Sequence, residues 1–123
     1  MDMPKCVAVD FDGTLDHGVY PDVFALDEFA LSVLSEYQAR GGKVILWTVR
    51  CGVPLDLAIA ALADHGFKPD VVNDNLPGAE IWLDRCGADE LSRKVYADVY
   101  IDDRATVDGV VDWSKWAQRL LSE

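Results

Sequence analysis

The sequence predicts an α/β fold, in which helices cover both faces of a doubly wound parallel sheet and give three layers. Short apolar runs typical of buried strands alternate with longer stretches whose apolar residues have helical spacing. This alternation is typical of right-handed crossovers between parallel strands. The length of 123 residues fits one domain, so we expect a single domain over residues 1–123.

The expected elements follow in order along the chain. Strands are expected over residues 5–11, 43–48, 70–72 and 99–101, and helices over residues 22–40, 54–65 and 113–121. Glycines follow the first two helices, where C-caps favour them, and Asp112 precedes the last helix as an N-cap. Residues 73–89 have the composition of a loop, and residues 91–95 fit a short helical turn.

The composition limits the kinds of partner and location. With 22 acidic and 11 basic residues, the net charge of -11 argues against an extended nucleic-acid surface or an anionic membrane surface. A local phosphate site that carries its own metal ion is still compatible with it. The odd number of widely spaced cysteines indicates free thiols in a reducing compartment. Neither a signal peptide nor an apolar run of membrane-spanning length is found, so we expect a cytoplasmic protein.

Two pairs of aspartates follow predicted strands. Asp10 and Asp12 end the first, and Asp102 and Asp103 end the last. Carboxylates this close repel each other, so either they are solvated turns and caps or a cation lies between them. Because the carboxyl ends of parallel strands meet at one edge of a sheet, we expect the two pairs to come together. Oxygen ligands without Cys or His favour Mg²⁺.

This constellation suits phosphate chemistry. One aspartate would attack the phosphorus atom and form an aspartyl-phosphate, while the second protonates the leaving oxygen and later activates water. Gly13 would let the backbone turn sharply and approach a phosphate closely. The Thr48 hydroxyl and the Lys94 ammonium would hold phosphate oxygens. The alternatives are that Thr48 is only the last residue of a strand and that Lys94 is a solvated surface lysine. Arg93 is a second candidate for the basic position.

Two further arginines stand close to these motifs. Arg50 follows Thr48, and Arg104 follows the second acidic pair. A guanidinium at either position would bind a second phosphate oxygen or a distal group of the substrate. The alternative for both is a salt bridge on an acidic surface.

Four motifs carry a resemblance to a known family. They are "VAVDFDGTL", Thr48 in "VILWT", Lys94 in "SRKVYADVY", and the acidic pair in "VYIDD". In these motifs the sequence resembles the phosphatase branch of the haloacid dehalogenase superfamily. The resemblance implies a phosphomonoester hydrolase with Asp10 as nucleophile and Asp12 as general acid and base. It also implies Mg²⁺ bound by Asp10, the backbone carbonyl of Asp12 and Asp103, with Asp102 as a nearby, water-mediated ligand, and substrate phosphate bound near Gly13 and Thr14.

Members of that family differ mainly in inserted cap domains. Here residues 15–23 are too few to fold alone, and residues 73–91 suffice only for a small flap, so the resemblance implies a domain without a cap. An open site of this kind would accept a phosphorylated small molecule, a phosphoprotein or a nucleic-acid end. Two alternatives stay open: a catalytically weak phosphate-binding regulator, and a response-regulator receiver that is phosphorylated on Asp74.

Overall fold

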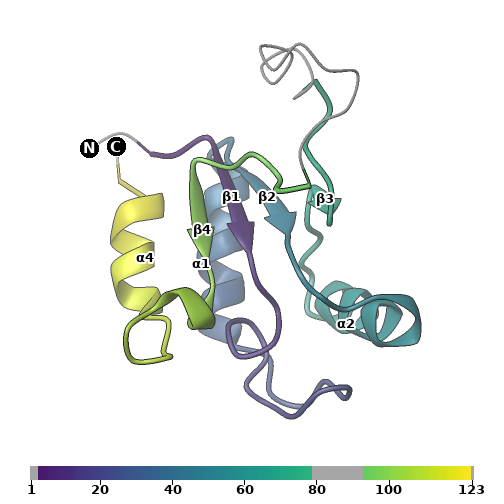
Figure 1. The fold of residues 1–123 in the computed structure, drawn as a ribbon. Helices are drawn as coiled ribbons and strands as arrows, with labels where there is room; N and C mark the ends of the chain where they lie inside the picture. The colour runs from purple at the N-terminus through teal and green to yellow at the C-terminus, as the bar shows by residue number, and fades with distance from the viewer. Residues whose placement is uncertain (1–2, 79–92, 123) are drawn as a thin grey trace.

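Four parallel strands form the sheet in the computed structural model, which describes residues 3–78 and 93–122 (Figure 1). The strands are β1 (Cys6–Val9), β2 (Lys43–Leu46), β3 (Val71–Val72) and β4 (Val99–Ile101). Their order across the sheet is β3-β2-β1-β4, so β1 lies between β2 and β4. All four residues of β1 are buried, as expected for a central strand with short apolar side chains.

The register brings the ends of β1 and β4 level. Val9 pairs with Leu46 on one side and with Ile101 on the other. The pairing continues one residue further, because the Asp10 amide donates to the Ile101 carbonyl over 2.9 Å. The first residues after β1 and β4 are therefore neighbours, although 92 positions separate Asp10 from Asp102 in the numbering.

Three helices of the described residues pack around the sheet: α1 (Glu28–Ala39), α2 (Gly52–Asp64) and α4 (Trp113–Leu120). Figure 1 shows α1 behind the strands, α4 beside β4 and α2 below β2 and β3. Residues from all three helices join Val7 and Val9 in one apolar cluster. A second cluster combines Cys6 and Ala8 with Val95 and Ala97, so it covers the opposite side of β1.

The predicted α/β class with a parallel sheet is confirmed. The predicted start of the first helix is wrong, because α1 begins at Glu28 rather than at residue 22. Asp27 caps it by accepting a hydrogen bond from the Ala30 amide over 2.9 Å. The preceding residues form a loop in which the buried Asp16 accepts a hydrogen bond from the Ala25 amide over 2.8 Å. The apolar residues of this loop have helical spacing. They do not form a helix because the backbone here donates a hydrogen bond to the Asp16 carboxylate instead.

Two other predictions concern the segment between β3 and β4. The expected turn over residues 91–95 is not helical at residues 93–95, and residues 91–92 lie outside the described residues. The small flap expected within residues 73–91 falls mostly on residues 79–92, which lie outside the described residues. In the part of the chain that the structure describes, no helix has both the length and the apolar character needed to span a bilayer.

Gly42 is packed against the buried ring of Tyr37. A Cβ atom at this position would overlap with the ring carbons, and the ring is held by a 2.6 Å hydrogen bond from its hydroxyl to the Pro4 carbonyl. We predict that Gly42→Ala lowers the free energy of unfolding by about 1–3 kcal/mol, because the core has no room for the methyl group. Urea denaturation measures this. In a Tyr37→Leu background the cost should shrink, and an equal cost in both backgrounds would contradict the explanation.

Candidate active site

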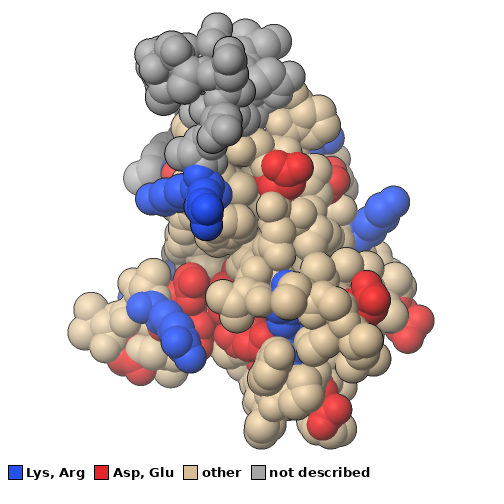
Figure 2. Space-filling model, turned by 45° about the vertical axis from the view of Figure 1, so that its right-hand side comes forward, with Lys and Arg blue, Asp and Glu red and all other residues tan. Residues whose placement is uncertain are grey.

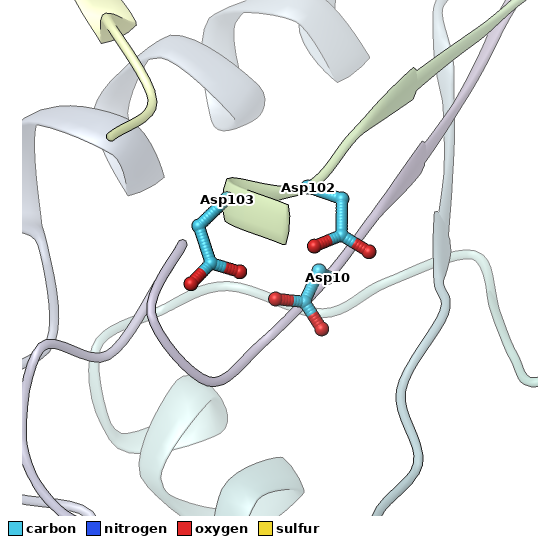
Figure 3. A group of neighbouring side chains, drawn as sticks. All are labelled: Asp10, Asp102 and Asp103. Atoms are coloured by element: carbon cyan, nitrogen blue, oxygen red, sulfur yellow. The ribbon is translucent and has the colours of Figure 1, made fainter. Parts of the chain in front are cut away.

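Three carboxylates come together at the carboxyl edge of the sheet. One oxygen from each of Asp10, Asp102 and Asp103 lies within 4.8 Å of the others, and the side chains point toward one another (Figure 3). Asp10 follows β1 and Asp102 follows β4, so strand pairing places them side by side. Asp103 begins a short 3₁₀ helix (Asp103–Ala105), which Asp102 caps by accepting from the Arg104 amide over 2.9 Å. The predicted convergence of the two acidic pairs is therefore present for these three residues.

Thr14 holds two members of the cluster in place. Its Oγ1 donates to Asp10 Oδ2 over 3.0 Å and accepts from the Asp103 amide over 3.0 Å. The Trp113 indole donates to the Thr14 carbonyl over 3.2 Å, which ties α4 to the same turn. Thr14 is fully buried, so the prediction that it binds substrate is wrong: it positions Asp10 and Asp103 instead.

The cluster has an excess of negative charge. Burial raises the pKa of Asp10 from 3.8 to about 7, with a further contribution from the charge of Asp102, against the hydrogen bond from Thr14 that lowers it. The buried Asp103 Oδ1 atom has no hydrogen-bond partner among the described residues. An oxygen that has lost water without gaining a donor is costly unless a cation faces it. The donor set, all carboxylate oxygens, fits a hard divalent ion such as Mg²⁺.

Gly13 leaves the space that the cluster needs. Its φ of +82° is in the left-handed region, and a Cβ atom built there would overlap with Asp103 Oδ2. Glycine is therefore required both for the turn and for the close approach of Asp103. This agrees with the predicted sharp turn, although the atom that approaches in the structure is a carboxylate oxygen.

A hollow of about 350 Å³ opens over the cluster. Its lining residues are Asp10, Asp12, Gly13, Val49, Asp102, Asp103 and Arg104. Figure 2 shows acidic side chains gathered low on one face of the molecule with basic ones beside them. Arg104 is exposed and is the basic residue among these lining residues, so its predicted substrate contact is sterically open. A larger hollow of about 680 Å³ lies at the opposite edge of the sheet. Its lining includes Lys5, which precedes β1, and Cys6, the first residue of β1.

Arg50 does not face this hollow. Its side chain is completely buried, and one edge of the guanidinium binds both Asp12 carboxylate oxygens, Nε to Oδ2 over 2.8 Å and Nη2 to Oδ1 over 2.7 Å. These hydrogen bonds raise the pKa of the guanidinium above its ordinary value. The prediction that Arg50 binds substrate is wrong, because the guanidinium is spent on protein groups. Of the alternatives, the salt bridge is the one found, although it is buried rather than on the surface.

The remaining two candidates lie beside the cluster rather than in it. Thr48 Oγ1 accepts from the Arg50 amide over 3.1 Å, and the Thr48 amide donates to Asn73 Oδ1 over 2.8 Å. Lys94 is exposed, and its Nζ lies 4.8 Å from the centre of the Tyr100 ring. Neither is among the described residues that line the hollow, so their phosphate contacts stay predictions. Arg93 is likewise exposed.

Sequence reasoning missed the residues that order this edge. Asn73 has a positive φ of 54° and links the end of β3 to the end of β2 through Thr48. Trp113 donates to the Thr14 carbonyl, a contact between the last helix and the first turn that no sequence motif indicates. The one signal for Asn73 was its residue type, since asparagine tolerates the left-handed region better than most residues.

Comparison with solved structures identifies a relative of this chain. No protein-family model matches the chain, and no curated protein does. A solved structure of a conserved protein from Bacteroides thetaiotaomicron superimposes with a TM-score of 0.77 and 34% sequence identity, covering 95% of this chain and 88% of that one. The chain belongs to the family of this Bacteroides protein. The two proteins thus share the α/β fold described above.

The raised pKa of Asp10 predicts how stability depends on pH. Because the folded-state pKa of about 7 lies above the ordinary 3.8, this group contributes stability below about pH 4 and loses it as the pH rises through about 7. In EDTA, wild type should therefore lose stability between pH 5 and pH 8 relative to Asp10→Asn, and Mg²⁺ should restore it at pH 8. Urea denaturation at each pH measures the difference. The exposed Asp56 supplies the control, Asp56→Asn, which should follow wild type; identical curves for Asp10→Asn and wild type would contradict the prediction.

The crowding at Gly13 predicts a defect in metal binding. Gly13→Ala should weaken Mg²⁺ binding by about 10- to 100-fold, because the methyl group displaces the Asp103 carboxylate. Isothermal titration with Mg²⁺ measures the affinity. Gly109→Ala is the matched control, since Gly109 also has a positive φ, of 76°, but faces open space. Equal Mg²⁺ affinity in the two variants would argue against the role assigned to Gly13.

Proposed function

We propose that the protein is a Mg²⁺-dependent phosphomonoesterase of the haloacid dehalogenase type, acting through an aspartyl-phosphate. The observation that carries the proposal is the cluster of Asp10, Asp102 and Asp103, in which the buried Asp103 Oδ1 has no donor among the described residues. Mg²⁺ bound by Asp10, the backbone carbonyl of Asp12 and Asp103, with Asp102 as a nearby ligand, would offset the repulsion between these carboxylates and an incoming phosphate.

The proposed reaction has two steps. An Asp10 carboxylate oxygen attacks phosphorus, the bond from phosphorus to the leaving oxygen breaks, and the Asp12 carboxyl donates its proton to that oxygen. Water then attacks the phosphorus of the aspartyl-phosphate while the Asp12 carboxylate takes one of its protons. Inorganic phosphate leaves, and the Asp10 carboxylate and the Asp12 proton are restored. Asp12 suits this role because it lines the hollow and its side chain is 30% exposed, next to Asp10.

The shape of the site supports a substrate that approaches from solvent. The hollow is small, and Arg104 at its rim would bind an anionic group of the substrate. We therefore keep three substrate classes: a phosphorylated small molecule, a phosphoprotein and a nucleic-acid end. The free thiols Cys6 and Cys51 support a reducing compartment, and we place the protein in the cytoplasm.

The strand order disfavours a receiver module. In the flavodoxin-like order of receivers, 2-1-3-4-5, the third strand lies beside the first. Here β3 lies at an edge of the sheet and β4 lies beside β1. Asp74, the residue a receiver would phosphorylate, directs its Oδ1 to the Asn75 amide over 2.8 Å rather than into the acidic cluster. A catalytically weak phosphate-binding protein is the remaining alternative.

Asp10 and Asp12 substitutions test the proposal. With Mg²⁺, wild type should hydrolyse an aryl phosphate, Asp10→Asn should be inactive because the nucleophile is lost, and Asp12→Asn should lower kcat by about 10²- to 10⁴-fold. Phosphate release measures turnover. With a substrate labelled in its phosphate group, wild type should carry label that hydroxylamine releases, and Asp10→Asn should carry none. Asp74→Asn is the control and should match wild type.

Several outcomes would overturn the proposal. Activity retained in Asp10→Asn would exclude Asp10 as the nucleophile. An inactive wild type that binds Mg²⁺ and phosphate would favour the regulatory alternative. The panel should include small phosphates, phosphopeptides and oligonucleotides with 3′- or 5′-phosphates, because these separate the three substrate classes.

A further inference from the structure

We infer that Arg50 is a positioning residue for the reaction: it holds the Asp12 carboxylate in one orientation toward the hollow without itself touching substrate. The inference rests on the proposed function, in which Asp12 transfers the proton. It starts from a complete set of hydrogen bonds around one buried side chain.

Every N–H of the Arg50 guanidinium has a protein acceptor. Two donate to the two Asp12 carboxylate oxygens, over 2.8 and 2.7 Å. The other three donate to the carbonyls of Pro21 and Pro54, both over 2.9 Å, and of Asp22, over 3.1 Å. A guanidinium has five N–H donors, so none is left for a phosphate oxygen. Arg50 is therefore placed behind Asp12 and not beside the substrate.

Two aromatic rings fix the guanidinium further. Its central carbon lies 4.8 Å from the centre of the Phe11 ring and 5.1 Å from that of Tyr20. Cation–π contacts of this kind add to the hydrogen bonds and resist rotation of the planar group. Phe11 is fully buried and precedes Asp12 directly, and the amides of residues 14–16 donate to its carbonyl, so the ring and the carboxylate belong to the same hydrogen-bonded turn.

The bidentate geometry has a consequence for Asp12. A carboxylate partly open to solvent normally samples several rotamers, and the entropy of those rotamers must be lost before it can act. Binding of both Asp12 oxygens by a fixed guanidinium removes that freedom in advance. A reacting group misplaced by about 1 Å can cost about 10²-fold in rate. The pair thus provides the orientation that the Asp12 carboxylate needs when it takes a proton from the attacking water in the second step.

A purely structural latch is the competing explanation. Arg50 also links the loop at Pro21 and Asp22 to the start of α2 at Pro54, so its loss would loosen three segments. A latch alone, however, has no need of an ionised partner that lines the hollow, since apolar packing stabilises a buried site at least as well as an ion pair. The two explanations differ in whether the effect of Arg50 passes through Asp12.

A kinetic double-mutant cycle separates them. Arg50→Lys keeps the charge but cannot bind both carboxylate oxygens, so kcat should fall by about 10²-fold while KM and inhibition by inorganic phosphate stay within about 2-fold. In an Asp12→Asn background the same substitution should cost little more, because its target is already gone. Millimolar guanidinium should raise the kcat of Arg50→Ala, and equal concentrations of urea or NaCl should not.

Controls keep the outcomes distinct. Arg40→Lys, at an exposed arginine paired with Glu36, should match wild type. Unchanged circular dichroism and Mg²⁺ affinity in Arg50→Lys would establish that the fold and the carboxylate cluster are intact. An unchanged kcat, a rise in KM instead, or costs that multiply fully in the double variant would overturn the inference while leaving the proposed function standing. A wild type without phosphatase activity would refute the proposed function itself, and this inference with it.

Discussion

Repulsion between carboxylates at one edge of the sheet is the constraint on which the rest of the structure depends. Parallel pairing of β1 with β4 makes Asp10 and Asp102 neighbours, and the next residue, Asp103, turns back toward them. The raised pKa of Asp10 and the unpartnered Asp103 Oδ1 are two consequences of the same crowding. The fold tolerates this cost because the rest of β1 is buried and securely paired on both sides. Such a concentration of charge is typical of functional sites rather than of structural ones.

The surrounding residues hold this charge in place without neutralising it. Thr14 bonds Asp10 and the Asp103 backbone at once, and Trp113 anchors Thr14 from the last helix. Arg50, the buried cation nearby, is fully occupied by Asp12 and backbone carbonyls. Asp10 thus receives a hydrogen bond from a neutral hydroxyl, that of Thr14, whereas Asp12 is paired with the Arg50 guanidinium. The three clustered acids keep the capacity to bind a divalent cation.

Much of the fold was predictable because its signals are local. Apolar runs of strand length and glycines after helices identified the strands and the ends of α1 and α2. The start of α1 was not predictable, because the Asp16 carboxylate accepts a hydrogen bond from the backbone amide of Ala25, nine residues away. The acidic residues of the site were predictable, since two pairs at strand ends must meet in a parallel sheet. Thr14 and Arg50 were misassigned to substrate, because a polar residue beside a motif gives no sign of its burial.

By itself, the sequence determined the α/β class, the strands and the meeting of Asp10 with the acidic pair at positions 102 and 103. These follow from residue patterns and from the rule that parallel strands end at one edge. Only the tertiary structure decided which polar residues face solvent and which are buried behind them. Thr14, Arg50 and Arg104 are all polar residues next to a motif, yet two are buried and one is exposed. Burial depends on how distant segments pack, and for Arg50 those segments are the turn after β1, the loop before α1 and the first turn of α2.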